Sequence, residues 1–240
     1  MTTGRTAFER AVADYRLTDL APPAEALAVA AASLDRTGLF LLGETHGVAQ
    51  TPLAILGLAQ RLDVRALAFE WSHDELDDVV QSVPSTGTVT SDALWRLPPS
   101  AEVFSGDGRF TAGHVRLLEH LGDQLDRIVL LDRVGSEGSE RELGMTRRLL
   151  AGRRRDSPML AVLGAGHVVR APLDDVKPVG LLIDEELPGV ANGVLAPSSG
   201  SVWFHGEHEY SAGEPPPADV VVPLGVAVPA VVPQHPLFAT

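Results

Sequence analysis

Strand-length apolar runs alternate with segments of helical spacing through most of this 240-residue chain. Each run is nearly continuous in apolar residues, which is typical of a strand buried on both faces. Strands that alternate with helices form right-handed βαβ units and therefore a parallel sheet. The sequence thus predicts an α/β fold with a mainly parallel central sheet and helices on both of its faces. The strands are expected at residues 39–43, 66–70, 128–131, 159–163 and 179–183.

The chain shows no internal repeat and no dividing linker, so residues 1–240 are expected to form a single domain. Within it, residues 38–187 would form the parallel core. Residues 84–110 are rich in Pro, Ser, Thr and Gly and predict a lid-like excursion over the sheet edge, where binding loops often occur. The change to short strands separated by Gly and Pro predicts a small C-terminal β-hairpin extension and a tail over residues 188–240, with strands at 201–205 and 219–224.

Helical periodicity and helix-start signals place helices between the strands. Thr51 and Pro52, for example, suit the N-cap and the first position of a helix. The segment before residue 24 is expected to be irregular, and the tail with Pro229, Pro233 and Pro236 to run extended along the surface. The expected helices cover residues 24–34, 51–62, 73–83, 92–97, 112–124 and 137–152.

Composition excludes several classes of function. The formal net charge of −13 argues against binding nucleic acid or an anionic membrane through a general basic field. The chain has no cysteine, which excludes disulfides, thiolate nucleophiles and thiolate metal sites. The first residues lack the apolar core of a signal peptide, and no window is apolar for long enough to cross a bilayer. We therefore expect a cytoplasmic protein with no nucleic-acid or membrane partner.

Ionisable side chains stand where the predicted strands end. Glu44 and His46 follow the first run, Glu70 closes the second, and Asp132 and His167 follow two later runs. In open parallel sheets, ligands bind outside the carboxyl ends of the strands. Because a buried carboxylate without a partner costs several kcal/mol, such groups are paired or used. We expect these side chains to meet in one site.

Structural explanations compete with this interpretation at each position. Glu70 could form an ion pair with Arg65, and His167 could be an ordinary histidine in a turn. Asp132 could cap the helix that follows it or pair with Arg133. Glu44 and His46 could cap the next helix, but that helix already has its own start signal several residues later, so capping does not account for this pair.

Two further patterns look functional and are rejected. The glycines at 164 and 166 follow a strand, but Val169 occupies the third glycine position of a dinucleotide fingerprint. They more plausibly form a tight turn that presents His167. In the run from His205 to His208, strand alternation separates the two histidines onto opposite faces, so we expect a polar strand end and not a metal site.

The motifs together resemble one superfamily, which contains the erythromycin esterases, the TraB/Tiki proteases and the ChaN-like haem-binding proteins. The resemblance rests on Gly43-Glu44-Thr45-His46-Gly47, Phe69-Glu70, Gly164-Ala165-Gly166-His167 and the helical stretch Ser139-Glu140-Arg141-Glu142-Leu143-Gly144-Met145, and it covers roughly residues 38–170. It implies an α/β fold with these histidines and glutamates around one cleft.

The branches of this superfamily imply different chemistry. In the esterases, the histidine equivalent to His46 is thought to activate water, assisted by glutamates like Glu44 and Glu70. The Tiki branch implies that similar residues hold a divalent metal, and the ChaN-like branch implies haem binding. Other relatives serve natural-product pathways.

These observations lead to a first hypothesis of a hydrolase-like enzyme that acts on an ester, lactone or amide in a small molecule or peptide. Catalysis would use His46, Glu44, Glu70 and His167. His46 would accept a proton from water, a glutamate would fix its tautomer, and His167 would face the developing oxyanion. Binding of the substrate would involve Asp132 and, on the excursion, Asp107 and Arg109.

Alternative functions use the same residues. A metal-dependent peptidase or hydrolase would hold Zn²⁺ or Mn²⁺ with His46, Glu44, Glu70 and His167. A biosynthetic tailoring enzyme would apply the same acid–base groups to cyclisation or dehydration. A haem-binding protein of the ChaN-like type would need no catalysis. We therefore expect either no cofactor, a divalent metal or haem.

Overall fold

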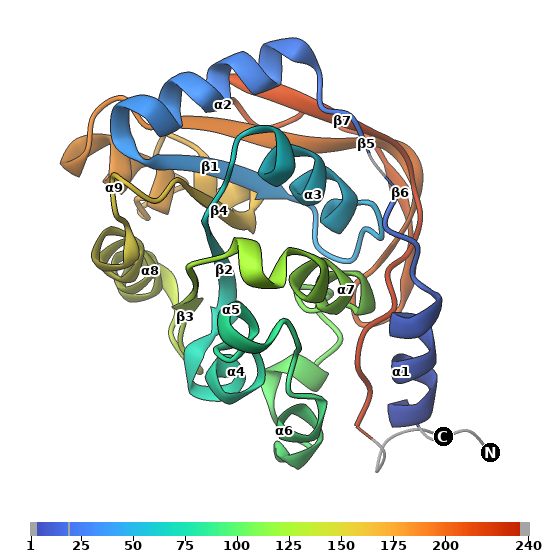
Figure 1. Ribbon diagram of the computed structural model, residues 1–240. Helices are drawn as coiled ribbons and strands as arrows, with labels where there is room; N and C mark the ends of the chain where they lie inside the picture. Colours follow the sequence, from blue (N-terminus) through green and yellow to red (C-terminus); the bar gives the residue numbers. More distant parts are fainter. Residues whose placement is uncertain (1–3, 19, 236–240) are drawn as a thin grey trace.

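The structure is a computed structural model that describes residues 4–18 and 20–235, and its strands form one sheet flanked by helices (Figure 1). The strands lie in the order β3-β2-β4-β1-β5-β6, and β7 also pairs with β5. Their bounds are β1 Leu39–Glu44, β2 Ala66–Ser72, β3 Arg127–Asp132, β4 Met159–Gly164, β5 Ala191–Trp203, β6 Glu207–Ser211 and β7 Val220–Ala227.

Helices connect these strands. The α-helices are α1 Gly4–Asp14, α2 Ala24–Thr37, α3 Thr51–Arg61, α4 His73–Val80, α5 Val83–Thr86, α6 Ser91–Arg96, α7 Ala112–Leu121, α8 Gly138–Gly152 and α9 Val179–Glu186. Short 3₁₀ segments are η1 Glu102–Phe104, η2 Gly122–Gln124 and η3 Ala165–Val168.

The predicted fold class is confirmed. Strands β1 to β4 pair in parallel with one another, and β5 is parallel to both β1 and β7. Only the β5–β6 pairing is antiparallel in the described part of the sheet, and it confirms a C-terminal hairpin. The hairpin partner of β5 is residues 207–211, whereas the strand expected at 219–224 is β7 and pairs in parallel with β5. Because β1 to β4 are parallel, their carboxyl ends lie along one edge of the sheet.

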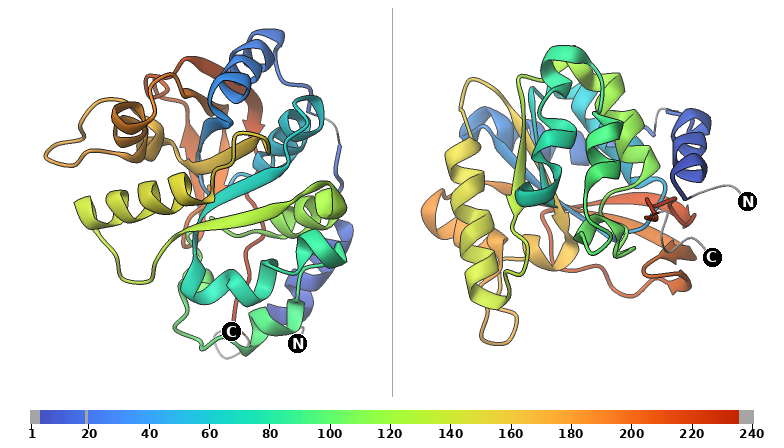
Figure 2. Two further views of the ribbon diagram at one scale, coloured as in Figure 1. Left: turned by 60° about the vertical axis from the view of Figure 1, so that its left-hand side comes forward. Right: turned by 90° about the horizontal axis from the view of Figure 1, so that it is seen from below.

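Both faces of the sheet are covered. In β1, Phe40 and Leu42 enter the apolar core formed with α1 to α7, whereas Leu39 and Leu41 enter a second core with α8 and α9. This alternation follows from the period of two along a strand. Figure 2 shows α8 on the opposite side of the sheet from α3 and α7.

One predicted strand is wrong. Residues Val179–Glu186 form helix α9 and not the strand expected at 179–183. A short apolar run fits either element, and here Val179 and Ile183, four residues apart, are both buried in the core beside α8. Strand β5 instead lies beside β1, so the parallel sheet continues beyond residue 187.

The ends of the chain differ from the prediction in smaller ways. The segment expected to be irregular contains α1, whose Phe8 packs against Trp95 and Phe110. Thr51 is the first residue of α3 and not its N-cap, a place that Gln50 occupies. In the tail, Pro229 forms a bridge with Val48, and Pro236 lies outside the described residues. Within the described ranges, no helix is long and apolar enough to span a bilayer.

Gly47 fixes the loop that follows β1. Its N–H donates to the carbonyl of Gly108, and its carbonyl accepts from the N–H groups of Trp203 and Ala230. Its φ of 75° lies in the left-handed region that favours glycine. Gly47 therefore joins the β1 loop to the 84–110 excursion, the end of β5 and the C-terminal segment.

We expect Gly47→Ala to destabilise the protein, because the added Cβ would lie 1.8 Å from the Trp203 carbonyl oxygen. Gly87→Ala is the matched control: Gly87 also has a positive φ, of 68°, but an added Cβ there meets no atom within 4 Å. Urea unfolding should show a loss for Gly47→Ala that exceeds the loss for the control by about 2 kcal/mol or more. Equal losses would show that the close approach is unimportant.

Candidate active site

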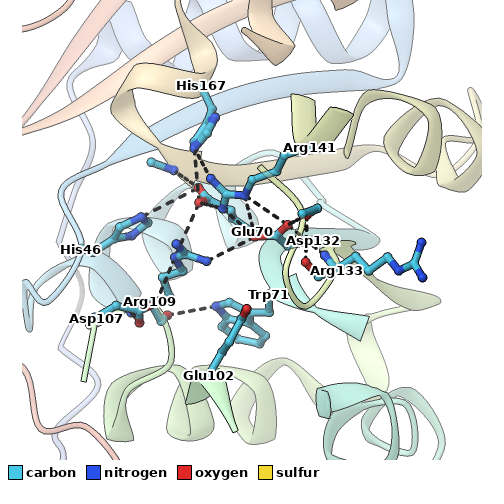
Figure 3. A network of polar contacts seen from close by, with 12 residues as sticks. His46, Glu70, Trp71, Glu102, Asp107, Arg109, Asp132, Arg133, Arg141 and His167 are labelled. Atoms are coloured by element: carbon cyan, nitrogen blue, oxygen red, sulfur yellow. Dashed lines mark hydrogen bonds and ion pairs between the residues drawn. The ribbon is translucent and has the colours of Figure 1, made fainter. Parts of the chain in front are cut away.

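Glu70 is the centre of a charged cluster at the carboxyl ends of the parallel strands (Figure 3). The residue is 2% exposed. Its Oε1 accepts a hydrogen bond from Arg141 Nη2 at 2.5 Å and lies 3.3 Å from His167 Nε2. Its Oε2 accepts the backbone N–H of Gly164 at 2.6 Å and lies 3.8 Å from His46 Nε2. These partners compensate a buried charge that would otherwise cost several kcal/mol, roughly.

Side-chain alternation and a register shift in β2 place Glu70 in this position. Alternation places Glu70 on the same face of the sheet as Ala66 and Ala68, which pack in the core beside α8. The pairing of β2 with β3 shifts register between Phe69 and Ser72, and such bulges re-aim side chains next to functional sites. Glu70 therefore reaches the end of the sheet where α8 begins.

His46 forms a pair with Glu44. The ring Nδ1 lies 3.1 Å from Glu44 Oε1, so the neutral ring donates from Nδ1 and leaves Nε2 as its basic nitrogen. Nε2 faces Glu70 Oε2, with 3.8 Å between the two atoms. Both glutamates are buried. One carboxylate thus orients the ring, and a second lies beside its basic nitrogen.

His167 forms a similar pair with a residue of α8. Its Nδ1 lies 2.6 Å from Glu142 Oε1, and the other oxygen of Glu142 accepts the N–H of Val179 at the start of α9. Its Nε2 lies between Glu70 Oε1, at 3.3 Å, and Arg141 Nη1, at 3.1 Å. A protonated Nε2 can donate to Glu70, and a deprotonated one can accept from Arg141. Both protonation states therefore have a hydrogen-bond partner.

Two arginines connect Glu70 to Asp132 at the end of β3. Arg141 contacts Asp132 Oδ2 through Nη2 at 2.5 Å and through Nε at 2.9 Å. Arg109, on the 84–110 excursion, lies 3.2 Å from Asp132 Oδ2 and 3.6 Å from Glu70 Oε1. Its Nε is 3.1 Å from Asp107. The excursion thus brings a cation over the strand ends.

The environment shifts the pKa values of the two carboxylates in opposite directions. Burial raises the pKa of Glu44 and outweighs its hydrogen bond to His46. Burial also acts to raise the pKa of Glu70, but His167, His46 and Arg109 outweigh it and hold that pKa well below its usual range. Glu70 is therefore ionised throughout the neutral range.

The two histidines of the cluster have raised pKa values. Burial acts to lower the pKa of His46, but the hydrogen bond to Glu44 and the charge of Glu70 raise it above its usual value. Burial opposes protonation of His167 as well, yet Glu142 and Glu70 raise its pKa to about 9. By contrast, burial lowers the pKa of His114 in the core to about 3. His167 is therefore cationic at neutral pH, whereas His114 is neutral.

Gly164 lies where the reactive groups converge. It ends β4 with an ordinary φ of −53°. A Cβ added to it would lie 3.0 Å from His46 Nε2, 3.2 Å from Glu70 Oε2 and 3.4 Å from His167 Cδ2. The two rings and the carboxylate thus surround one point, which a side chain at position 164 would fill.

The structure brings together all seven side chains that the sequence singled out. The contacts above link Glu44, His46, Glu70, Asp107, Arg109, Asp132 and His167 into one network. The sequence argument assigned no role to Arg141 or Glu142, although both lie in the α8 stretch that carries the family resemblance. Glu142 could have been found, because it begins the buried face that continues through Met145 and Leu149.

The rejected pattern at residues 205–208 also differs from its prediction. His205 is not part of a strand: it lies in the turn between β5 and β6, with a left-handed φ of 53°, and β6 begins at Glu207.

The donor set fits metal or haem poorly. Arg141 and the Gly164 N–H already hold the oxygens of Glu70, and a guanidinium at 2.5 Å would repel a cation there. His167 Nε2 lies between Glu70 and Arg141, so this nitrogen is already engaged, whereas the carboxylate partners of the two Nδ1 atoms fit metal ligation and proton transfer equally. In the described part of the chain, no group of three or more His, Asp or Glu side chains is arranged to hold a metal. The arrangement suits proton transfer better than metal or haem ligation.

Comparison with known proteins adds little. No protein family matches the chain, and no curated protein matches it. RRSP, a MARTX toxin effector domain from Vibrio vulnificus CMCP6, is similar with 17% identity and a TM-score of 0.45, over 80% of this chain and 38% of that one. The type III effector HopBA1 is similar with 18% identity and a TM-score of 0.43, over 84% of this chain and 98% of that one. At these levels of similarity neither structure carries an argument about this chain.

The raised pKa of His167 predicts a pH-dependent stability. The stabilisation is complete below the unfolded pKa of 6.5 and is lost as pH rises towards about 9. A shift of this size corresponds to at most about 3 kcal/mol. Urea unfolding between pH 6 and pH 10 should show this fall, and His167→Gln should flatten it. His46 adds to the slope in the same direction, so the variant should keep a smaller dependence.

The surface variant His120→Gln serves as the control and should retain the full dependence, because His120 lies outside the cluster and contacts Gln60. An identical fall in wild type and His167→Gln would contradict the assignment.

Proposed function

We propose that this protein is an acid–base hydrolase that cleaves an ester, lactone or amide. One observation carries the proposal: two histidines from distant parts of the chain face the same buried carboxylate of Glu70, and each is paired through its other nitrogen with a second glutamate. Such histidine–carboxylate pairs fix the tautomer and orientation of the ring for proton transfer.

His46 is the proposed general base. In its unprotonated form, with Nδ1 bonded to Glu44, the ring accepts a proton from water at Nε2 as the water oxygen forms a bond to the carbonyl carbon. The π electrons of the carbonyl move to its oxygen. Glu70, which remains ionised, stabilises the imidazolium that results. General-base catalysis of this kind contributes about 10²–10⁴-fold in rate.

The cations beside Glu70 are proposed to serve the second half of the reaction. Arg141 and Arg109 stabilise the negative oxygen that forms, as preorganised donors do in a water-poor site. His167 is protonated at neutral pH and gives the Nε2 proton to the departing alkoxide or amine when the bond to carbon breaks. Arg141 Nη1 then donates to the neutral Nε2. Exchange with solvent moves the proton from His46 back to His167 and restores the starting state.

His46→Gln should lower kcat/KM by about 10²–10⁴-fold, since the substitution removes the general base and keeps a polar side chain. The assay is a panel of p-nitrophenyl esters, lactones and anilides with purified protein. His120→Gln, on the surface of α7, should retain wild-type rates. If turnover by His46→Gln equals that of wild type, His46 is not the base.

Gly164→Ala should reduce activity. The added methyl group would occupy the point between His46 and Glu70, whereas the backbone conformation of Gly164 is open to any residue. We expect a loss of about tenfold or more in kcat/KM, with a cooperative unfolding transition that shows the variant is folded. Gly144→Ala on α8 is the control, because a Cβ there meets no atom within 4 Å. Full activity in Gly164→Ala would place the reaction elsewhere.

A further inference from the structure

A cavity of about 420 Å³ adjoins the charged cluster. It shares Arg109, Asp132 and Arg141 with the cluster. Among the described residues, its lining includes neither His46 nor His167, so it lies beside the proposed catalytic groups and does not contain them. Its volume falls within the range of about 300–1,000 Å³ that is typical of small-molecule sites.

An aromatic side chain borders this cavity. Phe204 lies in the turn between β5 and β6 and is 50% exposed. Its ring packs edge-on against His205, which also lines the cavity, with 4.4 Å between the ring centroids. A half-exposed aromatic ring at the wall of a polar cavity offers a contact surface for an apolar group.

The turn that contains Phe204 is hydrogen-bonded to the 84–110 excursion. The N–H of His205 donates to the carbonyl of Gly106, and its ring Nδ1 donates to the carbonyl of Ser105, each at 2.6 Å. His205 adopts a left-handed φ of 53°, which is disfavoured for a residue with a side chain. Such strain persists where surrounding contacts impose it, and it is concentrated at binding sites. Phe204 is thus held in place before any ligand binds.

The charge around the cavity disfavours an anionic ligand. Three arginines face four carboxylates, and Asp132 already pairs with both Arg109 and Arg141. The formal charge of the lining is therefore −1, which gives an anionic substrate no net attraction. The charged residues are Arg109, Arg133, Arg141, Glu102, Asp107, Asp132 and Glu137. The hydroxyl group of Ser105 remains for a hydrogen bond to a neutral oxygen or nitrogen atom, and that of Ser136, which already donates to the carbonyl of Arg133, can accept one.

We propose that this cavity binds the aromatic portion of an uncharged aryl ester or amide, with Phe204 against its ring. The proposal rests on the proposed function for the reaction, but the binding of the aromatic group stands on the cavity and on Phe204 alone. Phe204 is then a residue that determines substrate specificity and takes no part in proton transfer.

Binding can be measured separately from turnover in the His46→Gln variant of the full chain. The probes are N-benzylacetamide (a neutral aryl amide), N-methylacetamide (the same amide without the ring) and hippurate (an aryl amide with a carboxylate). In ligand-observed NMR titrations we expect N-benzylacetamide to bind at least about tenfold more tightly than either of the others.

Phe204→Ala, added to His46→Gln, should weaken binding of N-benzylacetamide by about tenfold and leave N-methylacetamide unchanged. Phe204→Leu should weaken binding of N-benzylacetamide by an intermediate amount. If the alanine variant does not fold, the leucine variant replaces it in the test. Val226→Ala is the matched control, since Val226 on β7 is an exposed apolar residue outside the cavity lining. It should leave binding unchanged.

The outcomes separate the two proposals. Binding that depends on Phe204, without hydrolysis of any ester or amide, would support this site and overturn the proposed function. Hydrolysis that depends on His46, with equal binding by the Phe204 variants, would support the proposed function and overturn this binding site. Binding of hippurate as tight as that of N-benzylacetamide would overturn the assignment of an uncharged ligand.

Discussion

The buried carboxylate of Glu70 is the constraint around which the site is organised. A charge that is almost fully removed from water must be compensated on every side, and the protein supplies one N–H, two guanidinium groups and two imidazoles. These partners come from four separate parts of the chain, since Gly164 and His167 share the turn after β4. The contacts with Glu70 therefore also connect several secondary-structure elements to one another.

The same ion pairs that compensate Glu70 prepare the neighbouring groups for proton transfer. Each histidine is held by a glutamate at Nδ1, so its Nε2 is directed towards Glu70. The carboxylates raise both histidine pKa values against the effect of burial, and that of His167 reaches about 9. Stability and chemistry thus depend on the same contacts, which is why the proposed activity and the pH dependence of folding involve the same residues.

Much of the site could be predicted because strand ends are visible in a sequence. An apolar run that stops at Glu70 or Asp132 marks a strand and places its end to within two residues, and parallel pairing places such ends along one edge. Arg141 and Glu142 do not stand at a strand end. The buried face of α8 could have shown Glu142, whereas the contacts of Arg141 with Glu70 and Asp132 depend on how the helix packs. The strand predicted at 179–183 is wrong for a related reason: its short apolar run fits either element, and contact with α8 decides in favour of a helix.

The sequence alone determined the α/β class, the parallel sheet and the residues that stand at its carboxyl edge, because periodicity and apolar continuity are local properties. Tertiary structure decided which of those residues touch, how Arg109 and Arg141 join them, and that Phe204 stands beside a cavity. These are long-range contacts between side chains, and their energies depend on distance, burial and the charge of neighbours that no local pattern encodes.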